Sequence, residues 1–318
     1  MKKAFCIGLF AFLLLSCDRF PTGEGSPLVL GVDAPLVDTR APSTGNNLLT
    51  TVFSVGDDLG VFLEPTVRYG AAAKTFRATS VTSPITLFQG YPDDVFFPGS
   101  GTVDIYAFHP ASVVSSDIRT STVDFTVASD QSSRADYAAS DLMYGSATGV
   151  ARTASPVPVT MNHALSRLTL RFSAGTATAA EQTAILAQLA NSTITMDGTV
   201  HTRIEGFNLG SPAGAYTVSL TNGAPVTFAT GTNVAFYSAA GDPEYSVILP
   251  PQTLPASTTI TVAPSGGSSV YGSFLADLVL EKGKEAVITL TVVKRTLTIA
   301  CIELVPWPGT PTTGTVVF

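Results

Sequence analysis

Charged residues are scarce in this sequence. Only 13% of its 318 residues are Asp, Glu, Lys or Arg, about half the usual ~25%. The 17 basic residues are outnumbered by 24 acidic ones, so the formal net charge is −7. Proteins that bind nucleic acid neutralise its phosphates with clustered lysine and arginine, and this chain has no such cluster. The sequence therefore predicts no nucleic-acid partner.

Cysteine is also rare, because Cys6, Cys17 and Cys301 are the only three. Cys6 falls in an N-terminal leader that we expect to be removed from the mature chain. The remaining two fit a modified residue and a lone thiol better than they fit a disulfide framework. The simplest interpretation of Cys301 is a small residue packed in a core.

Residues typical of enzyme sites are equally few. The three histidines are His109, His163 and His201. None has a metal-binding spacing, and Ser166 follows His163 without a nucleophile elbow or a third partner. The paired aspartates at 57–58 and 93–94 suit turns. We therefore expect no enzyme, no metal and no cofactor, although carboxylates distant in sequence leave a glycosidase open.

Long apolar runs are absent except for Ala4–Leu15, which follows the basic Met1–Lys3. Twelve residues are too few to span a bilayer but suit a signal peptide. The run ends in Leu14–Cys17, which resembles the bacterial lipobox. We expect residues 1–16 to be a lipoprotein signal peptide and Cys17 to carry acyl chains that anchor the protein. The alternative is an ordinary secretory signal with an incidental cysteine.

Residues 17–50 form a leader rich in Pro, Gly, Ser and Asn. Within it, Leu28–Val32 and Leu36–Val37 predict one strand, which is interrupted at Pro35. Arg40 lies in an extended loop before Ala41, and an isolated arginine in such a loop is an accessible protease site. The alternative is a plain surface charge.

Valine, threonine, serine and alanine dominate the rest of the chain, with 27 glycines and 21 prolines for turns. This composition is typical of all-β proteins. Near the midpoint, Val157–Phe172 alternates apolar and polar residues on either side of a turn, which predicts two half-buried strands. We interpret it as the hinge between two tandem antiparallel β-sandwich domains at 51–160 and 161–318. Thr178–Ala190 is the one helix candidate, a short insertion.

Several motifs together carry a family resemblance. They are GDDLGVF from Gly56, YAFHP from Tyr106, SDLMYGSA from Ser140, MNHALSRLTLRF from Met161, VILPPQT from Val247, LEKGKEAVITL from Leu280, and a C-terminal Trp307. In this order they resemble the fimbrillin family of Bacteroidales, the Mfa-like lipoproteins that build type V pili. The resemblance extends from Cys17 to Phe318 and implies two transthyretin-like domains.

The resemblance also implies how such a subunit assembles. The precursor would reach the outer membrane by its lipid, an arginine-specific protease would cut between Arg40 and Ala41, and a strand of a neighbouring subunit would fill the groove left by the leader. The subunits would form a fimbria that serves adhesion. The alternative is a monomeric surface lipoprotein, or a tip adhesin, that binds glycan or host protein.

The donor strand that we expect is Thr296–Phe318, at the C-terminal end of the second domain. Its alternating or terminal apolar residues are Leu297, Ile299, Cys301, Val316 and Phe318. The alternative for this segment is an ordinary last strand in its own sheet.

Overall fold

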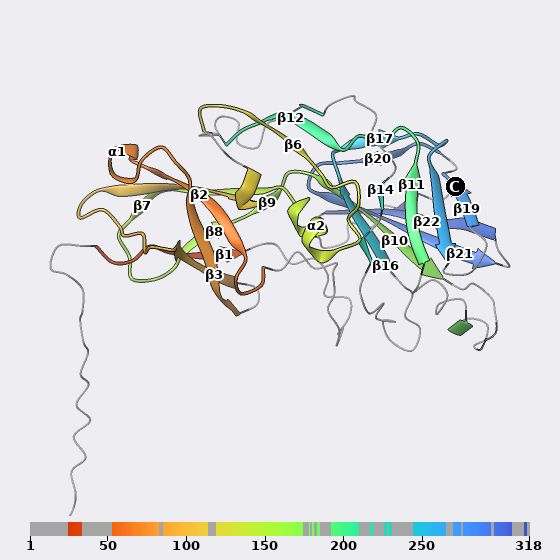
Figure 1. Ribbon diagram of the computed structural model, residues 1–318, viewed down its shortest axis with the longest axis horizontal. Helices are drawn as coiled ribbons and strands as arrows, with labels where there is room; N and C mark the ends of the chain where they lie inside the picture. The colour runs from red at the N-terminus through yellow and green to blue at the C-terminus, as the bar shows by residue number, and fades with distance from the viewer. Residues whose placement is uncertain are drawn as a thin grey trace, which may run out of the picture.

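In the computed structural model, most of the residues that are described lie in strands, which form two lobes (Figure 1). The structure describes residues 25–33, 53–82, 85–113, 119–173, 192–209, 244–264, 270–274, 276–293 and 296–306, short pieces at 217–218, 226–227, 229–230 and 315–316, and a few single residues near 180. The all-β fold with sandwich-type domains is confirmed.

The N-terminal lobe is a sheet of eight strands in the order β8-β1-β4-β3-β2-β5-β7-β9. Their bounds are β1 (Val29–Asp33), β2 (Asp58–Glu64), β3 (Lys74–Thr82), β4 (Ile85–Tyr91), β5 (Thr102–His109), β7 (Met143–Ala151), β8 (Val157–Thr160) and β9 (Asn162–His163). The two edge strands β8 and β9 are separated only by Met161. One continuous stretch therefore closes both edges, by pairing with β1 at one end and with β7 at the other.

The C-terminal lobe contains two larger sheets. The six-stranded sheet has the order β15-β16-β10-β21-β22-β23, and the four-stranded sheet has the order β14-β11-β18-β19. Their bounds are β10 (Ser166–Ser173), β15 (Ala229–Thr230), β16 (Glu244–Leu249), β21 (Lys284–Val293), β22 (Thr296–Pro306) and β23 (Thr315–Val316) for the first, and β11 (Ser192–Asp197), β14 (Val226–Thr227), β18 (Thr259–Pro264) and β19 (Val270–Ser273) for the second.

Two small sheets complete the structure. The first has the order β13-β12-β6 and the second joins β17 to β20. Their bounds are β6 (Val123–Thr126), β12 (Arg203–Phe207), β13 (Thr217–Val218), β17 (Gln252–Leu254) and β20 (Leu278–Leu280). Because β6 comes from the first half of the chain and β12 from the second, this sheet links the two lobes (Figure 1).

The helical elements whose bounds the structure describes are short: α1 (Thr66–Tyr69), the 3-10 turn η1 (Ala111–Val113) and α2 (Arg134–Ala139). Ser133 caps α2, since its hydroxyl accepts a hydrogen bond from the Asp136 amide at 3.1 Å. Among the described helices, none has the length and apolarity to cross a bilayer. The expected helix Thr178–Ala190 lies mostly outside the described residues and stays a prediction.

Each lobe has a core, and strand β2 contributes side chains to both. The N-terminal core runs from Leu28 on the leader to Met161. The C-terminal core also takes in side chains from the first half of the chain, including Phe62, Phe108 and Phe125. Strand β2 is buried at its five central residues because one face supplies the first core while Phe62 faces the second. A domain boundary at 160/161 stays a prediction.

Among the described strands, two pairs are parallel, namely β1 with β8 and β10 with β21. Apolar alternation reveals which face of a strand is buried but not its direction, so the expectation of antiparallel pairing did not anticipate them. Both pairs join strands far apart in sequence, as parallel pairing requires a long crossover.

Strand β10 corrects another expectation. The alternation in Val157–Phe172 predicted that Arg167 and Thr169 face water, but each is only 2% exposed. The prediction was wrong because both faces of β10 are covered. Arg167 lies opposite Glu285 of β21 in the strand register, and the opposite charge makes its burial tolerable.

Candidate functional site: the β1 groove and a neighbouring pocket

Strand β1 lies inside the sheet, although it belongs to the leader. It pairs antiparallel with β4 from Val29 to Asp33 and parallel with β8. Its backbone is therefore bonded on both sides, as in a central strand. The predicted strand Leu28–Val32 matches it within one residue, whereas Leu36–Val37 lies outside the described residues.

The inward side chains of this segment belong to the N-terminal core. Leu28, Leu30 and Val32 are at most 1% exposed. Burial of a large aliphatic side chain is worth about 1.5–3 kcal/mol, so the three contribute roughly 5–9 kcal/mol. Without them, the groove between β4 and β8 would expose core to water.

The outward side of β1 is narrow at Gly31. A methyl group there would lie 3.3 Å from the Pro156 Cβ and 3.5 Å from the Ile85 Cγ2. The ends are held by backbone hydrogen bonds: the Leu28 amide donates to the Val95 carbonyl at 2.6 Å, and the Asp33 carbonyl accepts from Met161 at 3.1 Å. The groove thus specifies apolar residues on one face and a small residue on the other.

The predicted processing residues Cys17, Arg40 and Ala41 lie outside the described residues, as does Phe318. Lipidation and the cut site stay predictions.

The candidate donor segment is partly described. Leu297, Ile299 and Cys301 lie on β22, which pairs with β21 over ten residue pairs. Val316 lies on β23, which is held to β22 by two pairs. In this structure β22 is thus a strand of its own sheet, and only the short β23 is weakly held.

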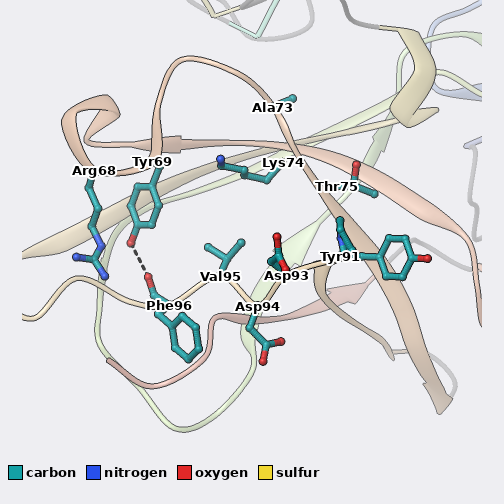
Figure 2. Close-up of a pocket in the computed structure, with 11 residues that line it drawn as sticks. Arg68, Tyr69, Ala73, Lys74, Thr75, Tyr91, Asp93, Asp94, Val95 and Phe96 are labelled. Carbon is teal, nitrogen blue, oxygen red and sulfur yellow. Dashed lines mark hydrogen bonds between the residues drawn. The ribbon is translucent and has the colours of Figure 1, made fainter. Parts of the chain in front are cut away.

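A pocket of about 530 Å³ opens beside this groove (Figure 2). It is formed by α1, the start of β3, the end of β4 and the segment 92–96. Its wall is fixed by the Tyr69 hydroxyl, which donates to the Phe96 carbonyl at 3.0 Å, and by Arg68, which donates to the Phe97 carbonyl at 3.2 Å. Burial is the main reason why the pKa of Tyr69 is raised, so its hydroxyl stays protonated.

The sequence did not reveal this pocket. Tyr91–Pro92 and the aspartates at 93–94 are recognisable as a turn, but nothing in the pattern places Arg68 and Lys74 beside them. The strand register of β3 against β4, with Thr75 opposite Tyr91, brings the two segments together.

The buried polar groups near the middle of the chain have structural partners. His163 Nδ1 lies 2.8 Å from the Asp141 carboxylate, and the Ser166 hydroxyl donates to the Glu281 carbonyl at 2.7 Å. The Ser166 hydroxyl therefore donates its proton to a backbone carbonyl and not to His163, so the two do not form a nucleophile–base pair. Within the described residues, no group of three or more His, Cys, Asp or Glu could hold a metal ion.

Gln131 is a residue that pattern analysis missed. Its side chain is fully buried, accepts from the Ile248 amide and donates to the Ile248 carbonyl, both at 2.9 Å. The side-chain amide thereby satisfies both backbone groups of one residue of β16, as the backbone of a neighbouring strand would.

Comparison with known proteins gives a consistent result. The family model described as fimbrillin-like matches residues 39–307. The fold is similar to a candidate cell adhesion protein from Bacteroides uniformis, with 17% identity, a TM-score of 0.61 and coverage of 91% of this chain and 100% of that one. A second, from Bacteroides ovatus, has 16% identity, a TM-score of 0.61 and coverage of 89% and 98%.

A tip fimbrial protein from Porphyromonas gingivalis is similar at 10% identity and a TM-score of 0.41, with coverage of 88% of this chain and 100% of that one. No curated protein matches. Since the family model spans most of the chain, the resemblance drawn from the motifs is confirmed. The chain therefore belongs to the fimbrillin-like family, among the fimbrial and adhesion proteins of the cell surface.

Proposed function

We propose that the chain is a structural subunit of a type V pilus that polymerises by strand exchange. The precursor is lipidated at Cys17, carried to the outer membrane and cut by an arginine-specific protease between Arg40 and Ala41. The observation that supports this best is the position of β1: it precedes Arg40 in sequence and lies between β4 and β8 in the sheet.

Loss of β1 would leave two unpaired strand edges and a bare apolar groove. Such an edge is a template for another strand, whose backbone supplies hydrogen bonds and whose alternate side chains fill the pockets. The incoming strand would regain the roughly 5–9 kcal/mol of apolar burial that β1 supplies. The result is a long-lived joint between subunits.

We place the donor in the C-terminal segment that follows Pro306 and includes Val316 and Phe318. The ten residue pairs between β22 and β21 would have to break for Leu297, Ile299 and Cys301 to leave their own sheet. The two pairs that hold β23 are far fewer.

The test is to treat the purified full-length chain with an arginine-specific protease and to follow its N-terminus, mass and assembly. We expect a new N-terminus at Ala41 together with SDS-resistant ladders. The variant Arg40→Ala should keep β1 and stay monomeric, whereas Arg19→Ala, the matched control in the same leader, should be cut at Arg40 and assemble.

Two outcomes would count against the proposal. A product that has lost residues 1–40 and remains monomeric would favour a tip or monomeric binder. If a chain truncated before Thr310 still forms ladders, the donor is not the C-terminal segment.

A further inference from the structure

The pocket beside β4 has the size and rigidity of a ligand site. Its volume of about 530 Å³ lies within the usual range of about 300–1,000 Å³ for small-molecule sites. The segment 92–97 is held from both sides, by hydrogen bonds from Arg68 and Tyr69 of α1 and from the Leu28 amide of the leader. A methyl group on Gly90 would lie 2.6 Å from the Asp93 carbonyl oxygen, so the turn is as tight as glycine allows.

Two opposite charges face into this space. Figure 2 shows the ammonium of Lys74 and the carboxylate of Asp93 directed toward the gap beside Tyr69, while Asp94 points away. Within the described part of the chain, neither side chain takes part in an ion pair. Because the pocket presents both a cation, Lys74, and an anion, Asp93, a ligand of one charge would be attracted by one of them and repelled by the other. The pocket suits a neutral polyol, whose hydroxyls both donate and accept.

Tyr91 lies at the end of the pocket opposite Tyr69, and Figure 2 shows its ring directed outward from the gap. Its side chain is among the exposed large hydrophobics, at 46%. One face of the ring is covered by the Arg77 guanidinium, whose Cζ lies 3.5 Å from the ring centroid. Asp58 holds that guanidinium with two hydrogen bonds of 2.7 Å. The ring is therefore held on one face, and its exposed part offers an apolar surface at the mouth of the pocket to the C–H face of a sugar.

We propose that this pocket binds a short glycan of one or two sugar units. Asp93 accepts hydrogen bonds from sugar hydroxyls inside the pocket, Lys74 donates to them, and Tyr91 stacks on a sugar ring that extends out of its mouth. Sugars combine hydroxyl edges with apolar faces, and this pocket presents partners for both. The site is complete in the uncut chain, so it does not depend on strand exchange.

The test is to apply the full-length, uncut chain to an array of oligosaccharides that end in galactose, mannose, N-acetylglucosamine, fucose or sialic acid. The strongest hit is then titrated by calorimetry. We expect at least one saccharide to bind, and Asp93→Asn, Lys74→Met and Tyr91→Ala each to weaken binding at least tenfold. Asp197→Asn, which removes an exposed carboxylate from the other lobe, is the matched control and should bind like the parent chain.

The three pocket side chains are partly or fully exposed, so their variants should keep the parent melting curve. The proposal is overturned if no saccharide on the array binds, or if binding is unchanged in all three variants. It is also overturned if a library of short peptides binds at the pocket, with the same loss in the three variants, while the saccharides do not.

Discussion

Arg167 and Glu285 show at the scale of single residues how this fold tolerates charge. Both are buried, and the Arg167 Nη2 donates to the Glu285 Oε2 at 2.7 Å. Thr169 donates to the other carboxylate oxygen at 2.5 Å. Breaking such a pair leaves an uncompensated charge in the core, which typically costs 3–5 kcal/mol.

We therefore expect Arg167→Met to lower the free energy of unfolding by about 3–5 kcal/mol, measured by urea titration. The matched control is Arg203→Met, whose partner Asp124 is about half exposed, and its stability should change little. A similar loss in both variants would mean that burial is not the cause.

The same pair predicts an acid dependence. Burial would raise the pKa of Glu285, but Arg167 outweighs it and holds the pKa below the ordinary value. An unfolded glutamate ionises at about 4.3, so the pair stabilises the fold fully above that pH and loses its effect as pH falls toward the folded-state pKa. Urea midpoints from pH 7 to 3 should fall less steeply below about pH 4.3 in Glu285→Gln than in the parent chain. Parallel curves would contradict this.

At the scale of elements, the antiparallel pair of β2 and β5 contributes side chains to both cores. The Phe108 ring lies across Gly60, where a methyl group would come within 2.0 Å of the ring carbon Cζ. Phe108 is fully buried and stacks on Phe62 with ring centroids 5.6 Å apart, so it has little room to move. Gly60→Ala should lower stability by about 1–3 kcal/mol through overpacking, measured by thermal melting. The control is Gly99→Ala, which should leave the melting temperature unchanged because its added methyl group has no other atom within 4 Å.

Alternation in the sequence predicted elements well where one face meets water. Leu28–Val32 is seen as β1 within one residue, and the two strands expected in Val157–Phe172 form as β8 and β10. The alternation pattern failed to predict burial where residues distant in sequence cover a side chain. Arg167 is buried because Glu285 lies opposite, and the pocket exists because β3 pairs with β4. Neither partner can be inferred from local pattern.

At the scale of the whole molecule, the two lobes interlock. Strand β6 pairs with β12, and Gln131 bonds both backbone groups of Ile248. We expect one cooperative unfolding transition in calorimetry, with equal calorimetric and van't Hoff enthalpies. Two resolved transitions in the parent chain would contradict this coupling.

The contribution of the two hydrogen bonds between the Gln131 side chain and the Ile248 backbone can be tested on its own. Gln131→Ala leaves the buried Ile248 groups unsatisfied, at about 1–3 kcal/mol each, and should lower the melting temperature. The exposed Gln89 provides the matched control, and Gln89→Ala should melt like the parent chain. If both variants melt alike, the hydrogen bonds between Gln131 and Ile248 do not contribute to stability.

If strand exchange proceeds as proposed, the narrow outer face at Gly31 restricts which donor sequences can replace β1. Leu30 and Val32 flank Gly31 in β1, so a donor that points Val316 and Phe318 inward presents Val317 at the constriction. A side chain there meets Pro156 and Ile85, which lie 3.3 and 3.5 Å from the first added carbon. Subunits whose donor strand carries glycine at this point would seat without displacing either residue, and the order of subunits along a mixed fibre would follow from that preference.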